Sequence, residues 1–176
     1  MKHTGKSRHG EALARAFGRV FVDTDTLIQE IDAAAGGHPA RTARDIFQED
    51  GVERFRQLET AACRLVAQRR EPIVVATGGG LCDNPAAVRS TSGGLLVHLV
   101  DSFEALSDRV FLRGIPAFLY TTDEEIGRKR FRELYDRRTT EYDALADIRV
   151  DLTGMTASCA QSHLIDMIRR RLDGGQ

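Results

Sequence analysis

The sequence predicts an α/β protein in which helices cover both faces of a parallel sheet. Three observations lead to this fold class. Short apolar runs alternate along the chain with amphipathic helical stretches. Two of these runs, residues 72–76 and 95–100, are almost wholly apolar, as expected for parallel strands buried on both faces. The third observation is a Gly-Lys-Ser sequence at residues 5–7, which matches the end of a phosphate-binding loop.

The phosphate-binding loop, or P-loop, has the pattern G-x-x-x-x-G-K-[ST] and normally follows a buried strand. Gly5, Lys6 and Ser7 supply its last three positions, and the first Gly would fall before Met1. A helix is predicted over 7–17, so that its first amides would point at an anion. Lys6 would then reach the β- and γ-phosphates, and Ser7 would offer its hydroxyl to Mg²⁺. The alternative is a solvated first helical turn.

The apolar pattern also predicts the remaining elements. Strands are expected at 19–23, 72–76, 95–100 and 148–152. Helices are expected at 26–34, 43–48, 52–69, 102–111, 124–142 and 156–172. The P-loop would need a further, central strand before Gly5, and a gap there would leave unpaired backbone groups that cost about 1–3 kcal/mol each. We therefore expect the natural protein to have residues upstream of Met1.

Length and charge restrict the class of protein. The 176 residues suit a single domain over 1–176. A net charge of −1 gives no reason to expect nucleic acid or a membrane as a partner. The three cysteines lack a C-x-x-C pair, so neither a zinc site nor a disulfide framework is indicated. We expect a cytoplasmic monomer.

Two carboxylates, Asp23 and Asp25, follow the predicted strand at 19–23. Ligands of open α/β sheets bind at the carboxyl ends of strands. Asp25 also fits as the N-cap of the next helix, which would explain one of the two acids. We expect Asp23 to act as a partner of hydrated Mg²⁺, and Asp25 to accept a proton from a substrate hydroxyl.

Further polar and flexible residues stand at positions that suit a binding site. Arg56 and Glu59 are spaced for an ion pair within one helix, which on its own would be a surface pair. Three successive glycines follow the apolar strand at 72–76, where a ligand could approach the backbone closely. Arg138 lies near the end of a strongly charged helix whose other charges suit a solvated face.

These motifs occur in a fixed order. F-V-D-T-D at 21–25, F-R-x-x-E at 55–59, A-T-G-G-G at 76–80 and R-x-x-x-Y at 138–142 follow the Gly-Lys-Ser sequence. The ordered set resembles the shikimate kinase family over nearly the whole chain. The resemblance implies a three-layer P-loop kinase fold whose parallel sheet has the order 2-3-1-4-5, with the first, central strand absent from this chain. It also implies a helical substrate-binding region over about 25–69 and a mobile lid over about 112–124.

The function implied by the resemblance is transfer of the γ-phosphoryl group of ATP to the 3-hydroxyl of shikimate, a step in aromatic amino-acid biosynthesis, with Mg²⁺ as cofactor. The implied nucleotide contacts are Thr4, Gly5, Lys6, Ser7 and Arg109. The implied metal partners are Ser7 and Asp23, and the implied catalytic groups are Lys6, Asp25 and Arg113. The implied shikimate contacts are Asp25, Arg56, Gly78, Gly79, Gly80 and Arg138.

The chain departs from the family pattern in the loop and in the lid. His3 stands at the place of a loop Gly, and Ile115 stands where the family lid carries an Arg that contacts the transferring phosphates. Arg113, two residues earlier, is the expected substitute. One alternative is therefore a catalytically impaired shikimate-binding or regulatory homologue. Another small-metabolite kinase, such as a gluconate or nucleoside kinase, is a further alternative, but it leaves Arg56, the glycines and Arg138 unexplained.

Overall fold

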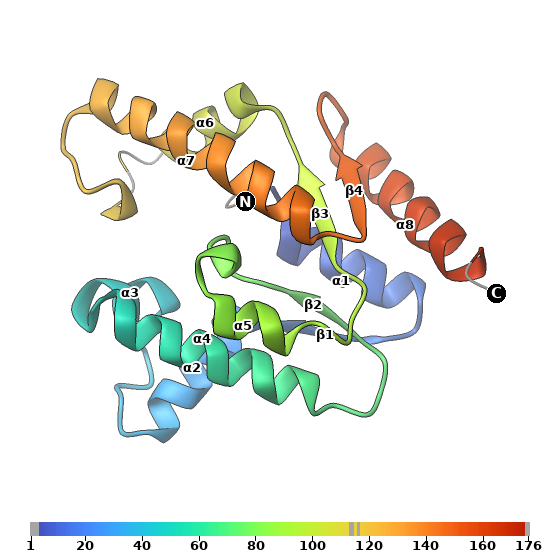
Figure 1. The fold of residues 1–176 in the computed structure, drawn as a ribbon, viewed down its shortest axis with the longest axis horizontal. Helices are drawn as coiled ribbons and strands as arrows, with labels where there is room; N and C mark the ends of the chain where they lie inside the picture. The colour runs from blue at the N-terminus through green and yellow to red at the C-terminus, as the bar shows by residue number, and fades with distance from the viewer. Residues whose placement is uncertain (1–3, 113–114, 116, 175–176) are drawn as a thin grey trace.

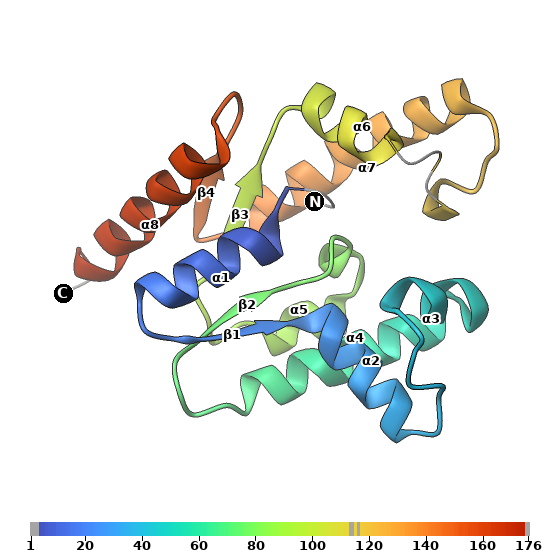
Figure 2. The ribbon, with the colours of Figure 1, turned by 180° about the vertical axis from the view of Figure 1, so that it is seen from behind.

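The computed structural model describes residues 4–112, 115 and 117–174. In this part of the chain the strands form two parallel pairs with helices on both faces (Figures 1 and 2). Strand β1 (Val20–Asp23) pairs with β2 (Ile73–Ala76), and β3 (Val97–Val100) pairs with β4 (Ile148–Asp151). The strand predictions are confirmed, each to within two residues at either end.

The two pairs are separate within the described residues. In the strand order implied by the resemblance, β1 to β4 would be the second to fifth strands, and the central first strand would lie between β2 and β3. The described residues place no strand there, and the two pairs occupy the outer positions of the predicted order. Helix α1 (Lys6–Ala16) packs against β1, β2 and α8 (Ala157–Asp173), and it therefore bridges the two pairs.

The helices agree with the predicted pattern apart from the shortest ones. The other longer helices are α2 (Thr24–Ala34), α3 (Ala43–Glu49), α4 (Gly51–Ala67), α6 (Phe103–Phe111) and α7 (Glu124–Leu145). The sequence did not predict α5 (Pro85–Ser90) or the 3₁₀ turns η1 (Leu81–Asp83) and η2 (Ala117–Leu119). These elements are too short for a helical period to show. A signal for α5 does exist, because Asn84 caps its N-terminus and Pro85 is its first residue.

Five predicted helix starts differ from the structure by one or two residues, and the capping side chain explains two of these differences. Asp23, rather than Asp25, is the N-cap of α2, and its Oδ1 atom accepts the backbone N–H of Asp25 at 2.9 Å. Ser102, which we predicted as the first helical residue, instead caps α6 by accepting the N–H of Ala105. In both cases the capping residue has extended backbone angles, and its side chain reaches an amide that has no partner inside the helix.

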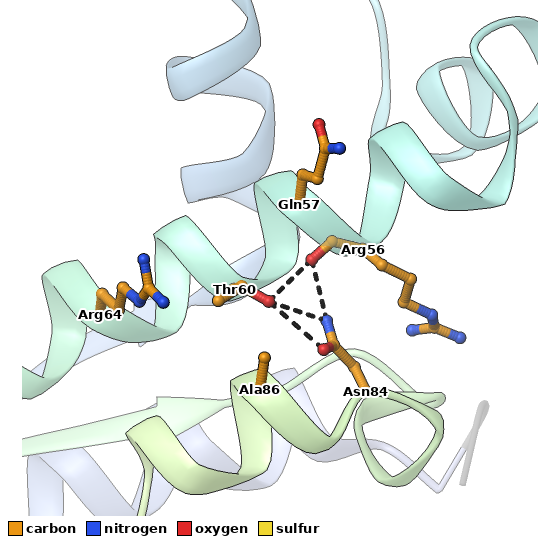
Figure 3. Close-up of a pocket in the computed structure, with 6 residues that line it drawn as sticks. All are labelled: Arg56, Gln57, Thr60, Arg64, Asn84 and Ala86. Atoms are coloured by element: carbon orange, nitrogen blue, oxygen red, sulfur yellow. Dashed lines mark hydrogen bonds between the residues drawn. The ribbon is translucent and has the colours of Figure 1, made fainter.

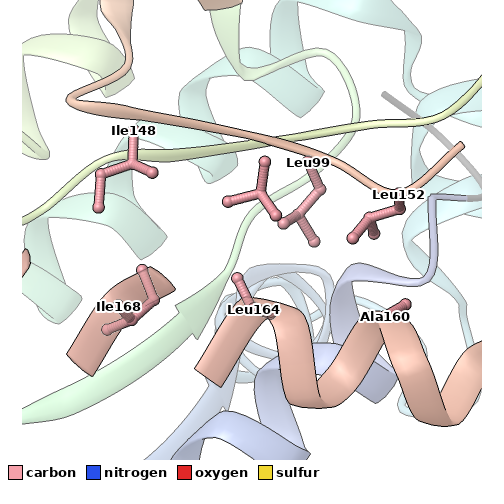
Figure 4. Close-up of a cluster of buried hydrophobic side chains, with 7 residues drawn as sticks. Leu99, Ile148, Leu152, Ala160, Leu164 and Ile168 are labelled. Atoms are coloured by element: carbon pink, nitrogen blue, oxygen red, sulfur yellow. The ribbon is translucent and has the colours of Figure 1, made fainter. Parts of the chain in front are cut away.

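The largest buried cluster joins β3 and β4 to α8 (Figure 4). Ile148 and Val150 of β4 point into this cluster, while Arg149 between them is exposed, as the alternation of a strand requires. Their partners are Leu99, Leu152, Ala160, Leu164 and Ile168. Residues of α1 also pack against the cluster, so burial of apolar surface fixes α1 beside α8.

The first strand pair determines where the site lies. Asp23 at the end of β1 is in register with Ala76 at the end of β2, so the acids after β1 and the glycines after β2 meet at one edge. Helices α4 and α5 lie on the face of this pair opposite to α1 (Figures 1 and 2). Among the described residues, the length and hydropathy that a membrane-crossing helix requires are not met by any helix.

The buried cluster predicts a clear difference between two leucines of α8. Leu164 is 3% exposed and Leu172 is 40% exposed. Replacing Leu164 with Ala should lower the free energy of unfolding by about 2–5 kcal/mol, because it leaves a cavity in the core. The control Leu172→Ala should change it by less than about 0.5 kcal/mol. Urea unfolding measures both, and equal effects would contradict the assigned packing.

Candidate active site

The Gly-Lys-Ser sequence lies at the N-terminus of α1, as predicted. Gly5 has a left-handed φ of 76°, and α1 begins at Lys6. The backbone N–H of His9 donates to the carbonyl of Gly5 at 2.9 Å, which closes the first helical turn. A Cβ on Gly5 would lie 3.1 Å from the His9 ring, so the angle and the space both require glycine. The first amides of α1 therefore have the arrangement that suits an anion.

The two aspartates after β1 have different environments. The hydroxyl of Ser7 donates to Oδ2 of Asp23 at 2.6 Å, so the loop and the end of β1 are joined directly. Asp23 also caps α2 through its other oxygen. Asp25 lies in the first turn of α2, and its Oδ1 atom is 3.3 Å from the position that a Cβ on Gly78 would take. Asp25 therefore borders the turn formed by Gly78, Gly79 and Gly80, called the glycine turn below. Asp23 borders the predicted phosphate-binding loop.

The glycine turn after β2 is hydrogen-bonded to α2 and lies beside arginine side chains of α4 and α7. The backbone N–H of Gly78 donates to the hydroxyl of Thr24 at 3.0 Å, and Thr24 is buried. A Cβ on Gly80 would lie 3.0 Å from the Nη2 atoms of both Arg56 and Arg138. The space beside the turn is thus bordered by two guanidinium groups, and a larger residue at position 80 would fill it.

Arg56 is held by a buried carboxylate. Its Nη1 atom donates to Oε2 of Glu59 at 2.7 Å, and the Glu59 side chain is 1% exposed. Nδ2 of Asn84 donates to the same Glu59 oxygen at 3.0 Å and to the carbonyl of Arg56 at 2.9 Å. Figure 3 shows Asn84 and Thr60 closing this network between α4 and α5. The pair that could have been a surface ion pair is therefore partly buried.

A hollow of about 430 Å³ lies beside the same network, on the outer side of α4 and α5. It is lined by Arg56, Gln57, Thr60, Arg64, Asn84 and Ala86 (Figure 3). The guanidinium group of Arg56 extends away from Arg64 and Ala86, toward Asp83. The charged end of Arg56 is thus directed at the glycine turn rather than at the hollow.

The sequence did not identify Asp83, which binds both predicted substrate arginines. Arg138 donates from Nη1 to the carbonyl of Gly79 at 2.9 Å and from Nη2 to Oδ2 of Asp83 at 2.5 Å. Arg56 approaches the same Oδ2 atom at 3.4 Å, and Arg137 donates to Oδ1 at 2.8 Å. A lone Asp after three glycines has no periodic or motif signal. Only the folding of α7 against η1 brings these groups together.

The described residues include one group of side chains with the spacing of a metal site, namely Cys82, Asp83 and Glu141. Arg137 contacts both carboxylates, and Arg138 pairs with Asp83 as well. Burial, the largest influence, raises the pKa of the Cys82 thiol to about 11, so this thiol is protonated at neutral pH. A protonated thiol beside two guanidinium groups does not suit a cation.

Comparisons with known proteins identify the family to which the chain belongs. The family model for shikimate kinase matches residues 3–169. The shikimate kinase of Desulforudis audaxviator is 41% identical over 153 residues, which cover 86% of this chain and 74% of that protein. The chain belongs to the shikimate kinase family. The predictions of the family, of the kinase class and of the α/β fold are therefore confirmed.

Other members of the shikimate kinase family extend the match. The shikimate kinase of Chromobacterium violaceum is 34% identical over 166 residues, covering 93% of this chain and 84% of its own. A solved shikimate kinase from Acinetobacter baumannii in complex with shikimate has a TM-score of 0.76 and 25% identity, covering 98% of this chain and 89% of that chain. A solved structure from Bacteroides thetaiotaomicron, with a TM-score of 0.79 and 22% identity, supports the fold.

Ile115 occupies the position at which the resemblance expects a lid arginine, and its side chain faces inward. Ile115 packs against the buried cluster of Leu106, Val110, Phe111, Leu119 and Phe131. Its Cγ2 atom is 3.3 Å from the position that a Cβ on Gly127 would take. The predicted substitute, Arg113, lies outside the described residues. Arg109 lies on α6, and its Nη1 atom donates to Oδ2 of Asp101, the residue after β3, at 2.6 Å.

The buried Glu59 predicts a stability effect. Replacing Glu59 with Ala should lower the free energy of unfolding by about 3–5 kcal/mol, because Arg56 and Asn84 lose a buried partner. Glu53→Ala, an exposed change on the same helix, serves as the control and should stay within about 0.5 kcal/mol. Denaturant unfolding at neutral pH compares the two. A Glu59 variant as stable as the control would show that this carboxylate does not support the site.

Proposed function

We propose that this protein transfers the γ-phosphoryl group of ATP to the 3-hydroxyl of shikimate. The observation that carries the proposal is that Arg56 and Arg138 converge beside Gly80 of the glycine turn. Asp25 borders the same turn at Gly78. Two guanidinium groups can bind a carboxylate, and a neighbouring carboxylate can accept bonds from hydroxyls. Shikimate offers these groups, and the Acinetobacter baumannii relative was solved in complex with it.

On the substrate side, each residue has a separate task. Arg56 and Arg138 hold the substrate carboxylate, and Glu59 keeps the Arg56 guanidinium in place through its 2.7 Å bond. Gly78, Gly79 and Gly80 allow the ring to approach the backbone. Asp25 accepts the proton of the attacking hydroxyl, so that oxygen can bond to phosphorus as the bond to the leaving nucleotide breaks.

On the nucleotide side, Thr4, Gly5 and the first amides of α1 bind phosphate oxygens, and Lys6 neutralises charge on the β- and γ-phosphates. Ser7 Oγ and Asp23 Oδ2, at 2.6 Å from one another, form an oxygen pair of the kind that Mg²⁺ prefers. When bound, Mg²⁺ would neutralise charge on the phosphates. Arg109 would lie against the nucleotide base.

The packing of Ile115 favours a second candidate, a shikimate-binding homologue with impaired catalysis. Charge on the transferring phosphoryl group needs a cation beyond Lys6 and Mg²⁺. Ile115 supplies none, so we assign that task to Arg113 in the lid over 112–124. A single domain over 1–176 acting as a cytoplasmic monomer, with residues 25–69 as the substrate region and no nucleic-acid partner, remains our prediction.

Phosphoryl transfer and carboxylate recognition are tested together. The chain should convert shikimate to its 3-phosphate with ATP and Mg²⁺, which ³¹P NMR detects, and EDTA should stop the reaction. Arg56→Ala and Arg138→Ala should each weaken shikimate binding by about 2–5 kcal/mol, because a substrate carboxylate loses its partner. Calorimetry measures this loss. Arg64→Ala, an exposed change on α4, is the control and should leave affinity unchanged.

Unchanged shikimate affinity in both arginine variants would rule out the assigned carboxylate site. Shikimate binding without phosphate transfer would favour the impaired homologue instead.

The lid assignment predicts a purely catalytic effect. Arg113→Ala should lower kcat at least about tenfold, about 1.4 kcal/mol, with little change in shikimate affinity. Arg132→Ala is the control and should leave kcat nearly unchanged. Its guanidinium group lies over the Phe103 ring at 3.4 Å, where α6 packs on α7. If the lid has lost its function, Arg113→Ala should do little and Ile115→Arg should raise turnover. An active enzyme indifferent to both changes would refute the lid argument.

A further inference from the structure

Asp83 lies where the guanidinium groups of Arg56 and Arg138 converge. Its Oδ2 atom is 2.5 Å from Nη2 of Arg138 and 3.4 Å from Nη2 of Arg56. Its Oδ1 atom accepts a hydrogen bond of 2.8 Å from Arg137. The same two Nη2 atoms border the space beside Gly80. The arginine pair that we assign to the substrate carboxylate therefore already binds a carboxylate of the protein.

The charges around this position balance. Three guanidinium groups face three carboxylates, namely Arg56, Arg137 and Arg138 with Glu59, Asp83 and Glu141. The Glu59 side chain is 1% exposed, whereas that of Asp83 is 20% exposed. Among the carboxylates that pair with Arg56, Asp83 is therefore the one that an incoming anion can reach.

Asp83 carries its negative charge at neutral pH. Burial alone would raise the pKa of this carboxyl group, but the guanidinium groups of Arg138 and Arg137 lower the pKa below its ordinary value. Its backbone is fixed, since its N–H donates to the carbonyl of Gly80 at 3.0 Å and the next residue, Asn84, caps α5. The side chain alone has to rotate for the arginines to be released.

We infer that Asp83 sets the affinity and selectivity of the site by competing with the substrate carboxylate for Arg56 and Arg138. The inference rests on the proposed function. A substrate carboxylate has to displace Asp83 from these arginines, so the loss of the Asp83 pairs offsets part of the free energy that its own pairing contributes. Because Asp83 is attached to the site, its effective concentration exceeds that of a free anion. A ligand must therefore add further contacts to bind tightly, such as hydrogen bonds from hydroxyls to Asp25, and carboxylates without such groups bind weakly.

The experiment compares Asp83→Asn with Glu141→Gln by calorimetry. Both changes remove one negative charge next to Arg137, but of these two carboxylates only Asp83 pairs with Arg56 and Arg138 within the described residues. The probes are shikimate, 1-cyclohexene-1-carboxylate, which has the carboxylate without the hydroxyls, and the methyl ester of shikimate. Asp83→Asn should tighten binding of both carboxylates by about tenfold and leave the ester unchanged. Glu141→Gln should change each affinity less than about twofold.

A second measurement uses the unaltered protein, in case Asp83→Asn fails to fold. Carbon-13 NMR follows the pKa of Asp83 with and without saturating shikimate, and this pKa should rise when the ligand carboxylate displaces Asp83 from Arg56 and Arg138. Equal or weaker carboxylate binding by Asp83→Asn, or an unchanged pKa, would overturn the inference. Tighter binding of cyclohexene carboxylate with no binding of shikimate would leave the inference standing and would overturn the proposed substrate.

Discussion

The ion pairs of the Asp83 carboxylate connect parts of the chain that are far apart in the sequence. Arg56 comes from α4, Asp83 from the turn after β2, and Arg137 and Arg138 from α7. Each guanidinium group has a second acceptor, so the arginines are held in position before any ligand arrives. Fixed donors lose less conformational freedom on binding than mobile ones, and the site depends on this arrangement.

Asp23 has a comparable role at the other end of the site. One of its oxygens accepts the Ser7 hydroxyl, and the other caps α2, which carries Asp25. A single side chain thus links the phosphate-binding loop to the helix that carries the proposed proton acceptor. From Asp25 the border of the site continues past Gly78 to Glu59, and so to Arg56. The proposed nucleotide and substrate sites are therefore connected through Asp23, Asp25 and Gly78.

In the predicted lid over 112–124, an apolar side chain stands where the family resemblance expects an arginine. Ile115 lies against a buried cluster of α6, η2 and α7 residues, where a guanidinium group would have to lose its hydration. Arg130 caps the same region, since its Nη1 atom donates to the carbonyls of Leu119 and Tyr120 at 2.7 and 2.8 Å. The part of the lid that is described is therefore held by apolar contacts and by backbone capping.

The sequence by itself determined the α/β class, the positions of the strands and the order of the motifs. Periodicity and glycine spacing are local properties, so Gly5, Ser7, Asp23 and the three glycines could be recognised without coordinates. The family resemblance added Arg56 and Arg138 to the residues expected in the site. The sequence misplaced the start of α2, because Asp23 and Asp25 have the same side chain and only backbone angles distinguish a cap from a first-turn residue.

The tertiary structure decided which charges meet. Asp83, Arg137 and Glu141 carry no recognisable motif. They form one network with Arg56 because α7 contacts η1, whose Asp83 also pairs with Arg56 of α4. It also decided that the strands form two pairs bridged by α1, and that Ile115 faces inward. A pattern along the chain records which residues share a face, whereas ion pairs and packing depend on distances between distant segments, which only the folded chain sets.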